Sequence, residues 1–82
     1  MKIKSDTYYK IYYNEDKEWY DILYTGNKWV YLIAYKHNNK PLIKYNEKLK
    51  WHDINSYQVF LNRASNIKIE EISKEEVFLE ML

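Results

Sequence analysis

The sequence contains no cysteine, one glycine, one proline and a single arginine, Arg63. The lack of cysteine excludes disulfide bonds, cysteine-ligated zinc and thiol catalysis. With so little glycine and proline the chain is not a linker, and its turns have to use Asn, Asp and Lys. No apolar run approaches the roughly 18 residues of a membrane span, so we expect no membrane partner. The lysine-rich N-terminal segment has no signal-peptide pattern, so we expect a cytoplasmic protein.

Charge of either sign in excess is also lacking, since thirteen basic and twelve acidic residues give a net charge of +1. This balance disfavours both an acidic nucleic-acid mimic and a basic protein that coats DNA. The 82 residues suffice for one domain, which we expect to span 1–82. Lys, Asn, Ile and Tyr, which AT-rich codons specify, are abundant, and this bias favours a phage or mobile-element source.

Aromatic and β-branched residues recur in short blocks between polar turns, a pattern typical of antiparallel β proteins. We predict strands at 8–13, 19–24, 29–36, 42–45 and from 67 towards 72, with turns at 14–17, 25–27, 37–41 and 46–48. The second turn holds Gly26, which we expect to supply the positive φ of a tight hairpin. Ser73 and Glu76 match a capping box, which predicts a C-terminal helix over 74–82.

The segment 53–64 fits two structures. Ile54, Tyr57 and Leu61 lie at helical spacing, whereas Tyr57, Val59 and Leu61 alternate as in a strand. We favour the strand because Tyr, Val and Phe cluster here, and we keep the helix as the alternative.

The predicted fold class is therefore α+β, mainly antiparallel β, as a small and partly open barrel or meander with a short C-terminal helix. The stretch Lys50–Val59 resembles a late strand of bacterial pleckstrin-homology-like domains, which implies a fold of that type. An SH3-like barrel is the other small architecture that fits. Such a chain has to close its sheet or cover its edges, and an exposed edge would allow a homodimer.

Catalytic and metal-binding patterns are weak. The serines lie in no nucleophile-elbow motif, and the two histidines, His37 and His52, are 15 residues apart rather than closely paired as in zinc sites. We therefore predict no catalytic residue, no metal and no cofactor. A small ribonuclease using His52 and Arg63 is a third hypothesis, although one arginine supplies little charge for a phosphate.

Aromatic residues make up 18% of the chain, with ten Tyr and three Trp. A small domain cannot easily bury them all, and exposed Tyr and Trp form the hot spots of protein interfaces. If Tyr9 and Ile11 face the core in the first strand, and Ile22 and Tyr24 in the second, the residues between them face solvent. The predicted aromatic face comprises Tyr8, Tyr12, Trp19, Trp29, Tyr31 and Tyr35, with a rim of Lys10, Lys28 and Lys36.

The sequence thus favours a small non-catalytic protein-binding module. Its size and source bias suggest a phage or mobile-element protein that binds and inhibits a host protein, such as a defence nuclease, by steric occlusion. The alternative is a small barrel that binds single-stranded nucleic acid, with bases stacked on Trp19, Trp29 and Trp51 and phosphates held by nearby Lys.

Overall fold

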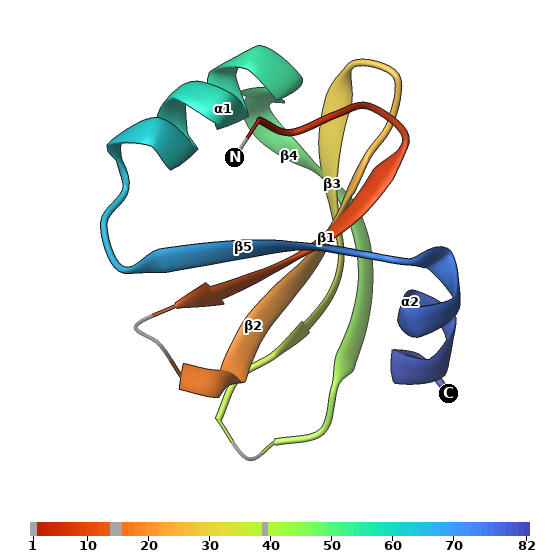
Figure 1. The fold of residues 1–82 in the computed structure, drawn as a ribbon. Helices are drawn as coiled ribbons and strands as arrows, with labels where there is room; N and C mark the ends of the chain where they lie inside the picture. The colour runs from red at the N-terminus through yellow and green to blue at the C-terminus, as the bar shows by residue number, and fades with distance from the viewer. Residues whose placement is uncertain (1, 14–15, 39) are drawn as a thin grey trace.

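One open antiparallel sheet of five strands carries two short helices in the computed structural model, which describes residues 2–13, 16–38 and 40–82 (Figure 1). The elements in chain order are β1 (Thr7–Tyr13), β2 (Asp16–Thr25), β3 (Trp29–Lys36), β4 (Ile43–Asp53), α1 (Ile54–Arg63), β5 (Ile67–Ile72) and α2 (Lys74–Glu80). The strand order is β4-β3-β2-β1-β5, so α1 carries the chain from one edge of the sheet to the other. This arrangement confirms the predicted fold class. Asn14 and Glu15 of the first predicted turn, and Asn39 of the third, lie outside the described residues. The prediction of a turn at Asp16 and Lys17 is wrong, because both belong to β2, which begins three residues before the predicted strand.

Within the segment 53–64, residues 54–63 form the helix α1, so the strand that we favoured there is wrong. The Asp53 side chain caps α1 by accepting a hydrogen bond from the Ser56 backbone N–H at 2.7 Å. Tyr57 is buried, and Ile54 and Leu61 pack against the same core cluster. Packing of this helical stripe outweighs the strand preference of Tyr, Val and Phe. The stretch that resembles a pleckstrin-homology strand is the end of β4 and the start of α1.

The fourth strand is longer than the predicted 42–45. It runs for 11 residues from Ile43 to Asp53, through the turn that we predicted at 46–48. Its pairing with β3 contains two register shifts. Such bulges let an edge strand accommodate extra polar residues without ending.

Gly26 has no positive φ, contrary to the expectation for its hairpin. A Cβ at this position would lie 3.1 Å from Cε2 of Tyr31, so glycine allows the ring to approach the backbone. Its N–H donates to the Trp29 carbonyl at 2.9 Å. In the described part of the chain, positive φ values belong to Asp6, Asn38, Trp51 and Asn66.

The two helices cover opposite faces of the sheet, so each face has a core of its own (Figure 1). The face that we call the α1 face buries Ile3, Tyr9, Ile11, Leu23, Val30 and Tyr57. The opposite one, the α2 face, buries Tyr12, Tyr20, Ile22, Ala34, Ile72 and Val77. The Ser73 side chain accepts a hydrogen bond from the Glu76 N–H at 3.1 Å, which confirms the predicted cap of the C-terminal helix.

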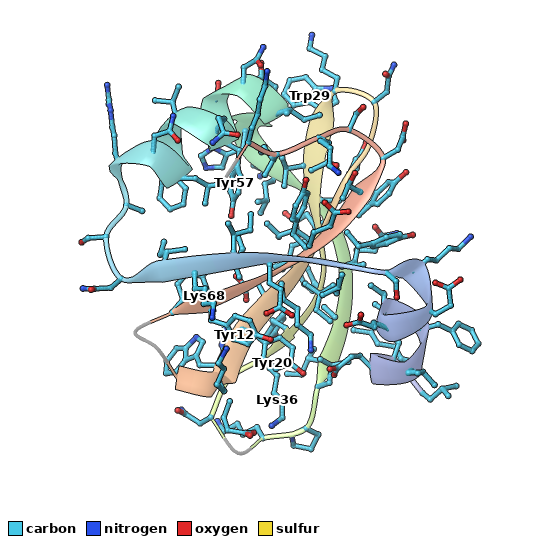
Figure 2. The ribbon with its side chains drawn as sticks, viewed as in Figure 1. Tyr12, Tyr20, Trp29, Lys36, Tyr57 and Lys68 are labelled. Atoms are coloured by element: carbon cyan, nitrogen blue, oxygen red, sulfur yellow. The ribbon has the colours of Figure 1, made fainter. Side chains whose placement is uncertain are left out.

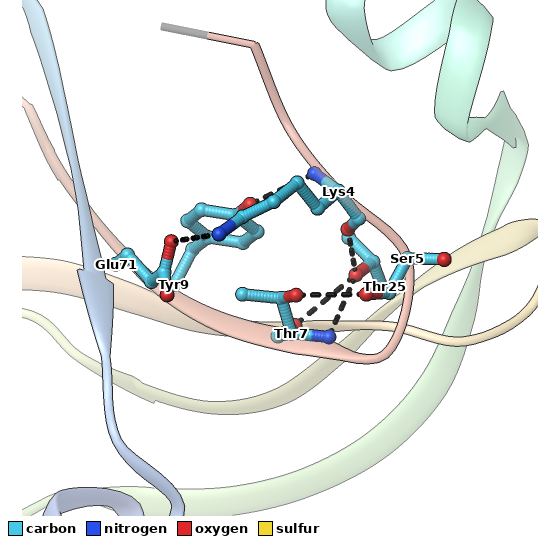
Figure 3. Close-up of polar contacts among 6 residues, drawn as sticks. All are labelled: Lys4, Ser5, Thr7, Tyr9, Thr25 and Glu71. Carbon is cyan, nitrogen blue, oxygen red and sulfur yellow. Dashed lines mark hydrogen bonds and ion pairs between the residues drawn. The ribbon is translucent and has the colours of Figure 1, made fainter.

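The N-terminal segment is fastened to the sheet by polar contacts (Figure 3). The Lys4 backbone N–H donates to the Tyr9 hydroxyl at 2.9 Å, and the buried Thr25 hydroxyl donates to the Lys4 carbonyl at 2.5 Å. The Lys4 ammonium also pairs with Glu71 on β5 at 2.9 Å. These contacts hold Ile3 in the core of the α1 face, where only 4% of it is exposed.

Candidate functional site

The six predicted aromatic residues do not form one face, because the sheet divides them between its two sides. Residues paired directly across strands share a face, as do residues two apart in one strand. Tyr35 pairs with Asp21, and Trp19 lies two residues before Asp21, so both rings lie on the α1 face. On the α2 face lie Tyr8, Tyr12, Trp29 and Tyr31.

Tyr12 is buried, so the prediction that it faces solvent is wrong. Only 8% of it is exposed, and its ring centroid lies 5.7 Å from that of Tyr20 (Figure 2). Both rings belong to the cluster to which α2 contributes Val77. Because α2 covers this part of the α2 face, strand side chains that point away from the core under α1 are also buried here.

Two of the three predicted rim lysines form ion pairs within the domain. The Lys10 ammonium lies 2.5 Å from one Glu80 oxygen, and the Tyr20 hydroxyl donates to the other at 2.7 Å. Burial disfavours the Glu80 carboxylate, but the hydrogen bonds from Lys10 and Tyr20 outweigh it and hold the pKa of Glu80 below its ordinary value. Lys36 pairs with Glu18. Lys10 and Lys36 therefore fasten α2 and β2 rather than rim a binding face.

A row of three tyrosines crosses the part of the α2 face that α2 leaves open. The ring centroids of Tyr8 and Tyr24 are 4.7 Å apart, and those of Tyr24 and Tyr31 are 6.5 Å apart. All three are half-buried, and the Tyr24 hydroxyl donates to Asp6 at 3.0 Å, which raises the pKa of Tyr24. Sequence alternation placed Tyr24 in the core and so missed it.

Next to this row, the ring of Trp29, labelled in Figure 2, has two ammonium groups close to it. The Nζ atoms of Lys28 and Lys48 are 5.2 Å and 4.4 Å from its ring centroid. A hollow beside the ring is lined by Lys48, Lys50 and Trp51, and the Trp51 side chain is 89% exposed. We call these five residues the tryptophan platform. Trp51 was absent from the predicted aromatic face, although its place between Lys50 and the cap of α1 could have marked it.

The lysines of the platform lack ion pairs among the described residues, although hydrogen bonds from Ser56 and, to a smaller extent, the charge of Lys28 lower the pKa of Asp53. Lys28, Lys48 and Lys50 form no ion pair with any described residue. Acidic residues gather instead on β5 and α2, at Glu70, Glu71, Glu75, Glu76 and Glu80. β4 and β5 are opposite edges of the sheet. β4 carries Lys44, Lys48 and Lys50 against Glu47 and Asp53, whereas β5 carries Lys68 against Glu70 and Glu71, so the first edge is weakly basic and the second weakly acidic.

A second group of aromatic residues, on the α1 face, packs and hydrogen-bonds within the domain. His37 stacks on Trp19 with ring centroids 4.8 Å apart, and it contacts Tyr35 at 4.9 Å. Asp21 accepts a hydrogen bond from the Tyr13 hydroxyl at 2.7 Å and lies 3.3 Å from Nε2 of His37. Burial, reinforced by Asp21, raises the pKa of Tyr13. These rings hold each other in place and leave Trp19 37% exposed.

The residues of the ribonuclease hypothesis are not brought into contact. The His52 ring packs against Tyr57 and Phe60, with centroids 5.5 Å and 6.1 Å away, and its Nδ1 is buried without a hydrogen-bond partner. Arg63 lies in the exposed last turn of α1. Within residues 2–13, 16–38 and 40–82, no three His, Asp or Glu side chains gather as metal ligands.

Comparison with protein-family models, with curated proteins and with solved structures finds no match for this chain. Among the described residues, neither helix has the length and apolar character needed to cross a membrane. The tryptophan platform and the tyrosine row beside it are therefore interpreted from their own chemistry.

Proposed function

We propose that the chain is a small non-catalytic binding module that engages another protein through the tryptophan platform. The observation that carries this proposal is Trp51, which is 89% exposed beside Trp29, Lys48 and Lys50. Tryptophan is enriched among the residues that dominate protein-interface energies. Burying such a side chain in a partner would supply about 2 kcal/mol or more of binding free energy.

The backbone at Trp51 supports this role because it is held in an unfavourable conformation. Its φ of 69° lies in the left-handed region, which costs a side chain with a Cβ roughly 1–2 kcal/mol. The next two residues are fixed in place: the His52 ring packs on Tyr57, and Asp53 caps α1. Strain that the surrounding structure imposes is concentrated at functional positions in proteins. Here it directs Trp51 away from the fold.

The platform defines the chemistry of its partner. Lys28, Lys48 and Lys50 have no ion pair with any residue that the structure describes, so a partner surface with acidic groups around an apolar recess would complement them. This refines the proposal of a phage or mobile-element inhibitor of a host protein. If the chain occludes a host enzyme such as a defence nuclease, it would bind an acidic patch on that enzyme and not the basic groove that holds nucleic acid.

Single-stranded nucleic acid is the second candidate, and the same platform favours it. Stacking of a base on Trp29 or Trp51, with phosphates at the neighbouring lysines, is the usual chemistry of such surfaces. Protein interfaces are depleted in lysine, which gives this alternative weight. Its affinity would fall steeply with salt, because phosphate contacts release counterions.

The test is capture from a lysate of the native host at two salt concentrations, using the wild type, Trp51→Ala and Trp19→Ala. Trp19→Ala is the matched control, since it removes a partly exposed tryptophan from the opposite face. We expect one host protein to be retained at both salts by the wild type and by Trp19→Ala, and to be lost with Trp51→Ala.

Other outcomes contradict the proposal in distinct ways. Nucleic acid that is captured at low salt only, and that depends on Trp51, would establish the second candidate. A host protein that Trp51→Ala retains would show that the platform is not the binding surface. Circular dichroism of each variant verifies that the sheet remains folded.

A further inference from the structure

The two edges of the sheet differ in how well they are protected against pairing with another chain. β4 carries Lys44, Lys48 and Lys50, and its pairing with β3 has two register shifts. Lysines and bulges are the devices that natural edge strands use to prevent association. β5 runs beside β1 from Ile67 to Ile72 without any register shift. No other described strand pairs with β5, so its outer edge presents a regular row of backbone groups.

The side chains of β5 are complementary to a second copy of the same strand. Lys68 and Glu70 pair with Tyr12 and Lys10 of β1, so both lie on the α2 face. Neither forms an ion pair with a described residue, because the Lys10 ammonium binds Glu80 instead. In an antiparallel pair with Ile69 on a two-fold axis, Lys68 of each copy lies opposite Glu70 of the other. Opposite charges in directly paired positions stabilise a sheet.

Registers shifted by one residue are worse. Centring the pair on Lys68 or on Glu70 would place two like charges opposite each other at the axis, which destabilises strand pairing. Pairing of β5 with the basic edge β4 of another copy would also bring opposite charges together. That contact is heterologous, however, and continues into an open filament instead of closing. The two-fold pair of β5 strands is therefore the arrangement that forms a closed dimer and also pairs each Lys68 with a Glu70.

A strand pair of six residues is small beside the roughly 1,200 Å² of a stable interface, so further surface is needed. α2 supplies it, since Phe78 and Leu79 are each 67% exposed and Leu82 is 85% exposed. Antiparallel pairing about Ile69 places α2 of the second copy beside the N-terminal end of β5. On that side the α2 face has a hollow lined by Tyr12, Lys17, Asn66, Ile67 and Lys68.

We propose that a second copy of this chain pairs with the β5 edge, forming a two-fold dimer with a continuous ten-stranded sheet. Ile69 lies on the axis, reciprocal Lys68–Glu70 pairs fix the register, and α2 of each copy packs beside the hollow of the other. The tryptophan platform lies on β3 and β4, at the edge of the sheet opposite β5. This dimer therefore leaves the platform free in both copies.

Sedimentation equilibrium of the wild type, Lys68→Glu, Glu70→Lys and the double variant Lys68→Glu/Glu70→Lys tests the dimer. We expect a dimer for the wild type and a dissociation constant about tenfold higher, or more, for each single variant. The double variant restores opposite charges at both positions and should recover the wild-type value. Lys50→Glu, which makes the same charge reversal on the β4 edge, is the matched control and should leave the dimer unchanged.

Three results would overturn the proposal. One is a wild type that remains monomeric at the highest concentration studied. Another is a dimer that Lys68→Glu leaves intact, since the interface would then lie elsewhere. The third is open-ended growth of oligomers that Lys50→Glu suppresses, which would mean heterologous pairing of β4 with β5. Circular dichroism verifies that each variant is folded. Lys68 lies outside the tryptophan platform, so Lys68→Glu should still capture the host partner, and loss of the dimer can be told apart from failure of the proposed function.

Discussion

Both faces of the sheet carry aromatic strand residues, and the helix on each face covers only part of them, since Trp19 on the α1 face is 37% exposed. On the α1 face, α1 and the N-terminal segment together bury Ile3, Tyr9 and Tyr57. On the α2 face, the shorter α2 covers Tyr12 and leaves Tyr8 half-buried in the row that leads to the tryptophan platform. Whether a strand aromatic is core or surface is thus decided by the reach of the helix above it. Alternation within the strand fixes only the side on which the ring lies.

The largest expected effect is in the core beneath α1. Tyr57→Ala should lower the free energy of unfolding by about 3–5 kcal/mol, because Tyr57 is 5% exposed and packs against His52 and Phe60. Val77→Ala, which removes the buried anchor of α2, should lower it by only about 2 kcal/mol. Urea denaturation with an unchanged m-value is the measurement. A greater loss for Val77→Ala would mean that the core of the α2 face supplies most of the stability.

The ion pairs of the two faces should differ in their pH dependence. The lowered pKa of Glu80 means that its contacts with Lys10 and Tyr20 stabilise the fold above the ordinary glutamate pKa of about 4.3. That stability disappears as the pH falls through and below this value. Glu80→Gln should therefore lose about 1 kcal/mol at neutral pH and match the wild type in acid.

The control for this prediction is Glu71→Gln. Glu71 pairs with Lys4 in an ion pair whose side chains are 63% and 47% exposed, so its loss should be undetectable at any pH. Chemical denaturation at a series of pH values distinguishes the two variants. Equal losses for both would show that the cover provided by α2 adds nothing to an ion pair.

The two histidines provide a smaller contrast on the α1 side. His52→Phe keeps an aromatic ring against Tyr57 and removes the buried, unpartnered Nδ1, so stability should rise by about 1 kcal/mol. His37→Phe removes a partner of Asp21 and should give no such gain. Thermal unfolding of both variants is the measurement. A loss of stability in His52→Phe would indicate that a hydrogen-bond partner for Nδ1 forms in solution.

The sequence was sufficient to predict most of the fold and only part of the site. The strand blocks other than the fourth, the Ser73 cap and the C-terminal helix are local patterns, and the structure confirms them. The helix α1 was misjudged because its tertiary packing outweighed the strand preference of its residues. Tyr12 was misplaced because the cover over it comes from α2, far along the chain. The pairing of Lys10 with Glu80 likewise joins residues 70 positions apart, which no local pattern encodes.

The smallest expected change in stability is at Trp51, where the sign matters more than the size. Trp51→Gly relieves the strain of a φ of 69° and removes a side chain that is 89% exposed. The gain is reduced by the added freedom of the unfolded chain, so the free energy of unfolding should rise by about 0.5 kcal/mol. The same variant should lose the partner that the wild type captures. Unfolding and capture measured on one preparation separate the two effects, and a variant that is less stable would mean that Trp51 packs within the fold. A gain in stability with a loss of binding is the result expected of a residue that is retained for its partner at the expense of the fold.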